Sequence, residues 1–261
     1  MGPTGREELF TVPHGAPAVA VDYSDLAATY DRTRSRPGEF EAFWWPAIAR
    51  LTGVRPGARI LDVGCGTGRL TVPLSESHMP VGVDSSAEML SVARGKGGRA
   101  AFVRGDACAL PFRDGSFDLA LAVMVLQLVR DVPAAVAELA RVARTALIAT
   151  IDMQTRARHA IDEAFPSFQR IDEARFPRIA DLEGACRQAG YRRVTTEVRR
   201  RHIESMPHEF IERVRARYVS TLSILPPGEF ERGLAWLEAE LPKRGPRYAY
   251  EHAVTFVAAS G

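Results

Sequence analysis

Residues 60–68 read Ile-Leu-Asp-Val-Gly-Cys-Gly-Thr-Gly, and this stretch decides the fold of the chain. Its first four residues are mostly apolar and predict a short buried strand. Gly64, Gly66 and Gly68 then alternate with other residues in a turn. Because glycine has no Cβ and accepts positive φ, a ligand can come into contact with the backbone of such a turn. We therefore expect a small polar molecule to bind on this loop.

Strand and helix patterns alternate on both sides of the loop. The predicted strands cover residues 58–63, 80–84, 100–104, 117–123, 145–151, 192–198 and 253–258. The predicted helices cover residues 39–51, 69–77, 87–94, 133–144 and 179–189. Apolar strands separated by helices are typical of a parallel sheet that is covered on both faces. The expected fold class is therefore α/β, with a doubly wound and mostly parallel sheet.

The bulk composition argues against several classes of protein. The chain has 261 residues and a formal charge of +2, which gives no sign of a nucleic-acid or membrane partner. Residues 1–15 lack the apolar core of a signal peptide, and the apolar run 119–129 is too short to span a bilayer. The cysteines and histidines show no metal-ligand spacing. We expect a cytoplasmic protein that holds no metal.

Polar residues fall at the ends of the strands that follow the loop. In an open α/β sheet, ligands bind beyond the carboxyl ends of the strands. Asp84 ends the second strand, where an acid can accept hydrogen bonds from ribose hydroxyls. Asp106 and Ala107 follow the third, where a carboxylate and a backbone N–H suit adenine. An adenine nucleoside with a polar tail would reach all of these positions.

The glycine spacing limits the chemical identity of the polar tail of that ligand. A dinucleotide loop reads G-x-G-x-x-G, but Arg69 stands beyond Gly68, and the G-x-x-x-x-G-K-[ST] phosphate loop is absent. The sequence resembles the class I S-adenosylmethionine-dependent methyltransferases, in the small-molecule branch known as the type 11 methyltransferase domain. The resembling segments are ILDVGCGTG (60–68), VGVDSSAEML (81–90), RGDACALPF (104–112) and SFDL (116–119), with weaker similarity over 176–194.

The resemblance implies a seven-stranded sheet with an antiparallel final strand, and S-adenosylmethionine as cofactor. It places Gly64, Gly66 and Gly68 under the methionine part, Asp84 at the ribose, and Asp106 with Ala107 at the adenine. The further residues that we expect around the cofactor are Tyr23, Tyr30, Asp62, Cys65, Ser85, Met89, Ala122 and Val123.

Three of these residues carry more detailed expectations. We interpret Asp62 as orienting the glycine loop through backbone N–H groups, and Cys65 as a small loop filler rather than a nucleophile. Ser85 and Glu88 have capping-box spacing and predict a helix start.

An N-terminal element adds a candidate for the cofactor carboxylate. Residues 30–34 read Tyr-Asp-Arg-Thr-Arg and resemble a family element whose second arginine often meets that carboxylate. This points to Arg34. Arg36 is the alternative, because Ser35 stands where the family often has proline. Either Tyr23 or Tyr30 is expected to close over the cofactor.

The chain departs from the family after the fourth strand. Leu126-Gln127-Leu128 stands where the family often has a His-His or His-Trp pair. Glutamine can donate and accept hydrogen bonds, but it cannot act as a base near neutral pH. We therefore expect catalysis by proximity and orientation, with Gln127 and Met124 as the candidates that face the substrate.

The remaining chain predicts additions to a cofactor-binding core. We assign residues 1–37 to an N-terminal segment that covers the site, 38–151 to the core, and the irregular stretch 152–177 to a lid. Residues 178–261 complete the core and carry a helical insertion at about 205–245.

The expected function is methyl transfer to a small-molecule metabolite, by a monomer or homodimer. The nucleophile, whether O, N, C or S, stays open. The alternative is a non-methylating protein on the same fold, either a cyclase or a regulatory module that binds the cofactor. The glycine spacing argues against a third possibility, a nicotinamide dehydrogenase.

Overall fold

A computed structural model describes residue 27 and residues 30–34 and 38–261. Tyr23 and Arg36, two of the residues considered for the cofactor, lie outside the described residues.

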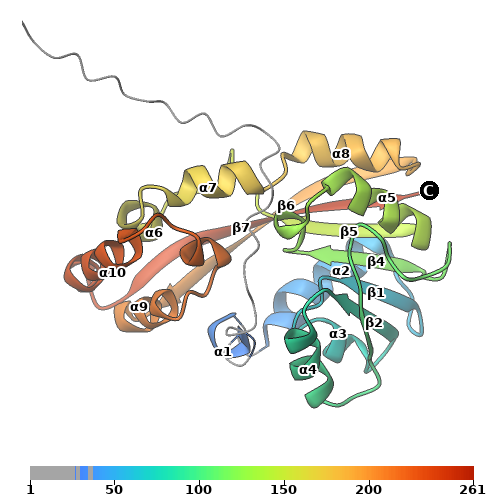
Figure 1. The fold of residues 1–261 in the computed structure, drawn as a ribbon, viewed down its shortest axis with the longest axis horizontal. Helices are drawn as coiled ribbons and strands as arrows, with labels where there is room; N and C mark the ends of the chain where they lie inside the picture. Colours follow the sequence, from blue (N-terminus) through green and yellow to red (C-terminus); the bar gives the residue numbers. More distant parts are fainter. Residues whose placement is uncertain (1–26, 28–29, 35–37) are drawn as a thin grey trace, which may run out of the picture.

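The centre of the fold is a seven-stranded sheet with the strand order β3-β2-β1-β4-β5-β7-β6 (Figure 1). The strands are β1 (Arg59–Val63), β2 (Met79–Asp84), β3 (Ala101–Arg104), β4 (Leu119–Val123), β5 (Thr145–Thr150), β6 (Arg193–Ser205) and β7 (Tyr248–Ser260). The pairs among β1 to β5 are parallel, while β7 pairs antiparallel with both β5 and β6. The predicted sheet with its antiparallel final strand is confirmed.

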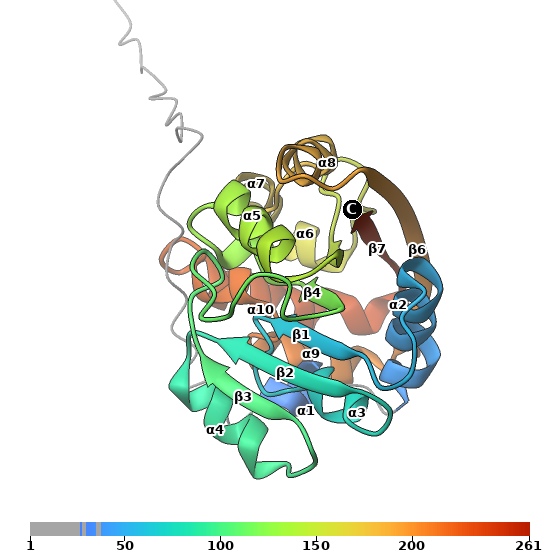
Figure 2. The same ribbon diagram turned by 90° about the vertical axis from the view of Figure 1, so that its right-hand side faces the viewer.

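Helices cover both faces of the sheet (Figure 2). The α-helices are α1 (Tyr30–Arg34), α2 (Trp45–Thr52), α3 (Thr71–Leu74), α4 (Ala87–Gly95), α5 (Val132–Val142), α6 (Ala160–Ala164), α7 (Phe168–Arg175), α8 (Ile179–Gln188), α9 (Pro207–Arg215) and α10 (Glu229–Glu240). A π-helix (Phe40–Trp44) leads into α2, and short 3-10 turns cover Leu126–Leu128, Ser220–Ser223 and Leu241–Arg244. The helices α5 and α8 pack on one face, and α2 and α3 pack on the other.

The last two strands are about twice as long as the sequence predicts. Only residues 255–260 of β7 pair with β5, so residues 248–254 continue past the sheet, paired with residues 199–205 of β6. We call this extension, with α6, α7, α9 and α10, the wing; Figure 1 shows it beside the layered sheet. Exposed charged residues such as Arg200 and Glu251 interrupt these strands, which hides the apolar signal that marks a central strand.

The wing has an apolar core of its own. It is built on Tyr248 and Tyr250 from β7, with Phe165 and Phe168 from residues 152–177 and Phe210 from α9. The sequence leaves 152–177 irregular, but the structure forms α6 and α7 there. Such short helices depend on tertiary packing rather than on their own periodicity, so a sequence pattern does not reveal them.

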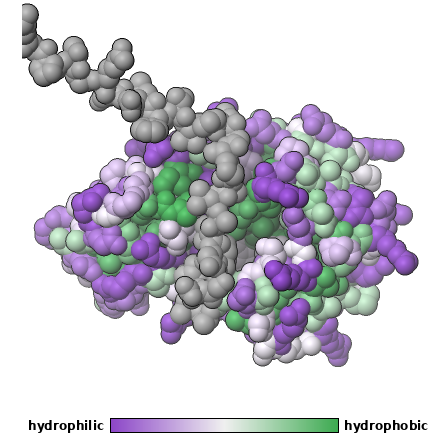
Figure 3. Space-filling model, in the orientation of Figure 1, coloured by the Kyte–Doolittle hydropathy of each residue, from purple (hydrophilic) through white to green (hydrophobic). Residues whose placement is uncertain are grey.

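The outer surface is mostly hydrophilic, while apolar residues gather toward the middle of the face in Figure 3, between the wing and the layered sheet. Within the part of the chain that the structure describes, no helix combines the length and the apolar character needed to cross a membrane.

Candidate functional site

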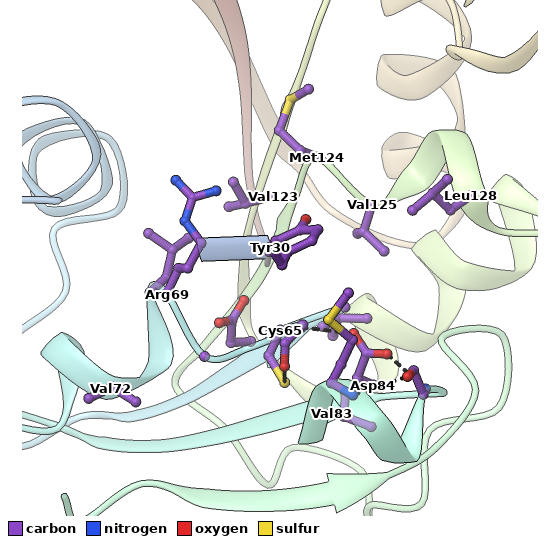
Figure 4. A pocket seen from close by; sticks show the side chains of 18 of the residues that line it. Tyr30, Cys65, Arg69, Val72, Val83, Asp84, Val123, Met124, Val125 and Leu128 are labelled. Atoms are coloured by element: carbon purple, nitrogen blue, oxygen red, sulfur yellow. Dashed lines mark hydrogen bonds between the residues drawn. The ribbon is translucent and has the colours of Figure 1, made fainter. Parts of the chain in front are cut away.

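A cavity of about 840 Å³ lies at the carboxyl ends of β1, β2 and β4 (Figure 4). This is the edge of the sheet at which the sequence predicts the ligand. The predicted residues that line it are Tyr30, Asp62, Gly64, Cys65, Gly66, Gly68, Asp84, Ser85, Met89, Asp106, Ala107, Val123 and Met124. Its size is typical of a site for a small molecule or cofactor.

The glycines of the loop have different physical tasks. All three have positive φ: 70° at Gly64, 54° at Gly66 and 76° at Gly68. A Cβ on Gly64 would lie 2.2 Å from Cγ2 of Val125, so this glycine is required by packing. A Cβ on Gly66 would meet no heavy atom within 4 Å. The backbone of Gly66 is therefore open to the cavity, so a ligand could approach it closely.

Asp84 is held in place by the loop and by the next helix. Its Oδ2 accepts a hydrogen bond of 2.8 Å from the backbone N–H of Gly66, and its Oδ1 accepts one of 2.9 Å from Ser86. Each carboxylate oxygen has a second lone pair for a ligand, so Asp84 is oriented to accept from hydroxyl groups. Ser86, not Ser85, caps α4, because its Oγ accepts from the backbone N–H of Met89 at 3.1 Å.

Asp106 lines the same cavity and lies in the turn after β3. Its Oδ1 accepts from the backbone N–H of Cys108 at 2.8 Å, and its Oδ2 lies 3.2 Å from Nη2 of Arg130. Half of the Asp106 side chain is exposed. Asp84 and Asp106 therefore both contribute carboxylate oxygens to the lining of this cavity.

Asp62 does not orient the loop as the sequence predicts. It is almost fully buried, and its Oδ2 accepts from the hydroxyl of Thr71 at 2.6 Å, whereas the N–H of Gly66 goes to Asp84. Asp62 thus supports the start of α3. Burial raises the pKa of Asp62 to about 7, against the effect of the Thr71 hydroxyl, and the nearby charge of Asp84 raises it further.

Because the pKa of Asp62 is raised, the difference in stability between Asp62→Asn and the wild-type protein should depend on pH. The folded protein holds a proton on Asp62 that the unfolded chain has lost above its ordinary pKa of 3.8. Wild-type stability therefore falls, through this group, as pH rises from about 4 to 7. The amide of the variant does not titrate, so the variant should gain on the wild type by up to about 1.4 kcal/mol for each pH unit in that window. Urea unfolding at pH 5, 6, 7 and 8 measures this gain, and parallel profiles for the two proteins would contradict it.

Cys65 is unsuited to nucleophilic chemistry. Its side chain is buried, and burial raises the pKa of the Cys65 thiol, with the carboxylates of Asp62 and Asp84 acting in the same direction. Its sulfur lies beneath β2, where a Cβ on Gly82 would come within 2.7 Å of it. Among the described residues, no group of three or more His, Cys, Asp or Glu side chains could hold a metal ion.

Three predicted residues do not line the cavity. Ala122 is completely buried and packs in the cluster with α5, because successive residues of a strand face opposite sides. Arg34 folds back along α1, where its Nη1 donates to the Tyr30 hydroxyl at 2.9 Å and its guanidinium lies 4.2 Å from the Tyr30 ring centre. Gln127 is the third.

Gln127 supports the turn after β4 and does not line the cavity. Its side chain is buried, and Nε2 donates to the carbonyl oxygen of Met124 at 2.7 Å. Met124 has a φ of 54°, an uncommon conformation for a residue with a Cβ, and it lines the cavity. Val125, the next residue, fills the space against Gly64. The amide of Gln127 therefore stabilises the turn that joins the two sides of the site.

Loss of this hydrogen bond should loosen that turn. Gln127→Leu keeps the volume but leaves the Met124 carbonyl without its donor, so we expect the free energy of unfolding to fall by about 1–3 kcal/mol. Met124→Gly removes the strain at the turn, so the same glutamine substitution should cost less in that background. Urea unfolding of the four proteins measures the coupling. An equal cost in both backgrounds would show that Gln127 does not support the Met124 conformation.

Several residues of the site carry no sequence motif. Glu39 lines the cavity and accepts from Arg201 at 2.5 Å and from Nε1 of Trp44 at 3.2 Å, with Nη2 of Arg69 at 3.4 Å. Burial acts to raise the pKa of Glu39, but the hydrogen bond and charge of Arg201, with Arg69 and Trp44, bring it below its usual value. Arg201 is 162 positions away in the sequence, so no local pattern connects the pair.

Trp44 is one of two adjacent tryptophans within the helix that the sequence predicts at 39–51. It is buried against Phe43 and Phe256 and also lines the cavity, so it belongs to the core and to the site together. Trp45 is only half-buried and packs against Phe40 and His78.

Comparison with known proteins places this geometry in a family. A family profile described as a methyltransferase domain matches residues 61–146. A demethylmenaquinone methyltransferase from Beutenbergia cavernae is 35% identical over 141 residues, which are 53% of this chain and 58% of that protein. The chain thus spans little more than half the length of that relative. The solved structure of a protein described as a methyltransferase from an antibiotic biosynthesis pathway of Anabaena variabilis has a TM-score of 0.69 at 19% identity. It covers 83% of this chain and 96% of its own, which supports the fold.

One relative extends the match over most of the chain. A malonyl-[acyl-carrier protein] O-methyltransferase from Serratia marcescens is 31% identical over 191 residues, which cover 70% of this chain and 71% of that protein. Because this relative is 31% identical and the match covers more than two thirds of its length, the chain belongs to the methyltransferase family.

Proposed function

We propose that the protein transfers a methyl group from S-adenosylmethionine to a small-molecule acceptor. The observation that carries this proposal is the pairing of Gly66 with Asp84. The open backbone of Gly66 and the oriented carboxylate of Asp84 meet at 2.8 Å on the floor of one cavity. A ligand with a ribose on the acid and a flexible tail along the glycines would satisfy both.

The other residues of the cavity have roles that fit this cofactor. Asp106 and the backbone N–H of Ala107 would hold the adenine, and Met89 would pack against it from α4. When bound, the cofactor supplies an electrophilic methyl group on its sulfonium. The protein then has to align a nucleophile with that methyl group and exclude water, and orientation alone can contribute about 7–11 kcal/mol. The turn at Met124, which Gln127 stabilises, would help to hold the acceptor in line.

The lining of the cavity favours an acceptor with an apolar or aromatic face. Tyr30, Phe40 and Trp44 contribute aromatic surface to the cavity, and Leu128 contributes aliphatic surface. Of the two relatives, one is named for demethylmenaquinone and the other for a malonyl group on acyl-carrier protein. We propose that the wing and residues 152–177 form the lid that selects the acceptor and shields the reaction.

Binding and product formation test this function separately. Isothermal titration calorimetry should show binding of S-adenosylmethionine and S-adenosylhomocysteine but not of NADH. Incubation with a metabolite panel should then release S-adenosylhomocysteine, detected by mass spectrometry. Absence of cofactor binding would overturn the proposal. Binding without S-adenosylhomocysteine from any acceptor would favour the alternative, a cyclase or a cofactor-binding regulatory module on the same fold.

A further inference from the structure

Arg69 follows the glycine loop directly and lines the cavity, with about a quarter of its side chain exposed. We propose that Arg69, rather than Arg34, binds the methionine carboxylate of S-adenosylmethionine; this inference rests on the proposed function. Figure 4 shows Arg69 and Asp84 on either side of Cys65. A cofactor with its ribose on Asp84 would extend its tail across the glycine loop toward Arg69.

The other cationic side chains that line the cavity are less suited to this role. Lys96 forms a close ion pair with Asp31, which also accepts from the hydroxyl of Thr67. Arg130 pairs with Asp106, at the side of the cavity that we assign to adenine, and its side chain is 73% exposed. Arg34 does not line the cavity, and its Nη1 donates to Tyr30.

The ion pair of Arg69 is longer than those of Lys96 and Arg130. This ion pair is with Glu39, at 3.4 Å, which is longer than the contacts of the same carboxylate with Trp44 and Arg201. The other oxygen of Glu39 accepts from Arg201 at 2.5 Å and from Trp44 at 3.2 Å. Arg69 can therefore turn to a ligand while Glu39 keeps a charged partner, so no buried carboxylate is left unpaired.

The chemistry of the side chain suits a carboxylate. The guanidinium presents parallel N–H groups that match the two oxygens of a carboxylate, and such charge-assisted pairs are among the stronger hydrogen bonds in proteins. Loss of the pair should lower affinity roughly 10- to 100-fold. The loss should be confined to ligands that have the carboxylate.

A ligand pair that differs only in this group tests the inference. Decarboxylated S-adenosylmethionine keeps the adenine, ribose, sulfonium and amine. Calorimetric titration of both ligands into the wild-type protein, Arg69→Gln and Arg34→Gln gives a cycle in which only direct contact produces coupling. Arg32→Gln, an exposed position on α1, is the control. Melting temperatures confirm that each variant is folded.

We expect Arg69→Gln to weaken S-adenosylmethionine and to leave the decarboxylated ligand unchanged, while the Arg34 and Arg32 variants resemble the wild type. Equal weakening of both ligands by Arg69→Gln would overturn the inference, because it would mean that Arg69 only supports the loop. Selective weakening by Arg34→Gln would overturn it in favour of the residue that the family resemblance indicates. If neither ligand binds the wild-type protein, the proposed function fails as well.

Discussion

Gly66→Ala is expected to reduce the affinity for S-adenosylmethionine by roughly 100-fold or more, while the fold is retained. The added Cβ would meet no protein atom within 4 Å, so the substitution should lower the free energy of unfolding only through the left-handed backbone conformation, by about 1–2 kcal/mol. The new methyl group would instead occupy the cavity beside Asp84, where we place the cofactor tail. The backbone could then no longer approach the ligand closely.

Gly115→Ala is the matched control for this experiment. Gly115 has a φ of 61°, close to the 54° of Gly66, and a Cβ there also meets nothing within 4 Å. Gly115 does not line the cavity. The two variants should therefore lose similar stability in urea unfolding, but only Gly66→Ala should lose calorimetric binding. Equal affinities in the two variants would show that the ligand does not approach Gly66.

Asp84→Asn should lower the affinity for S-adenosylhomocysteine by roughly 100-fold, which corresponds to about 2.7 kcal/mol. The carboxylate accepts from two backbone N–H groups, at Gly66 and Ser86, and has its remaining lone pairs for the ribose. An amide in its place turns one acceptor into a donor and removes the charge that strengthens the hydrogen bonds. Calorimetric titration measures the change.

Asp118→Asn controls for the loss of a carboxylate that accepts from backbone. Asp118 Oδ2 accepts from the N–H of Arg59 at 2.8 Å, at the start of β1 and therefore at the opposite edge of the sheet from the cavity. This variant should bind S-adenosylhomocysteine like the wild type. If Asp84→Asn also binds normally, the ribose does not lie on Asp84, and the assignment of the whole cavity would have to change.

The core of the site was predictable because it is local in the sequence. One strand, one loop and one helix lie within about twenty residues, and the glycines at 64, 66 and 68 have the positive φ that their spacing suggests. Asp84 and Asp106 were found because parallel strands of a doubly wound sheet end at a shared edge. The details within that frame were less predictable. Asp62 bonds Thr71 rather than the loop, and Ser86 caps α4 in place of Ser85.

Two of the expected site residues do not line the cavity, for a shared physical reason. Gln127 and Arg34 were assigned to the ligand by their position relative to a motif, but both side chains find partners in their own turn, at Met124 and Tyr30. A long polar side chain satisfies its donors with whatever lies within reach, and a motif does not specify its rotamer.

The sequence alone predicts the α/β class, the edge of the sheet at which the cavity lies and the glycine loop, because each depends on residues that are neighbours along the chain. The wing emerges only from the tertiary structure, in which β6 and β7 pair over thirteen residues while α9 and α10 lie between the two strands in the sequence. The tertiary structure also brings Glu39 together with Arg201 and Arg69. Contacts over such separations depend on packing of the whole chain, and neither periodicity nor spacing encodes them locally.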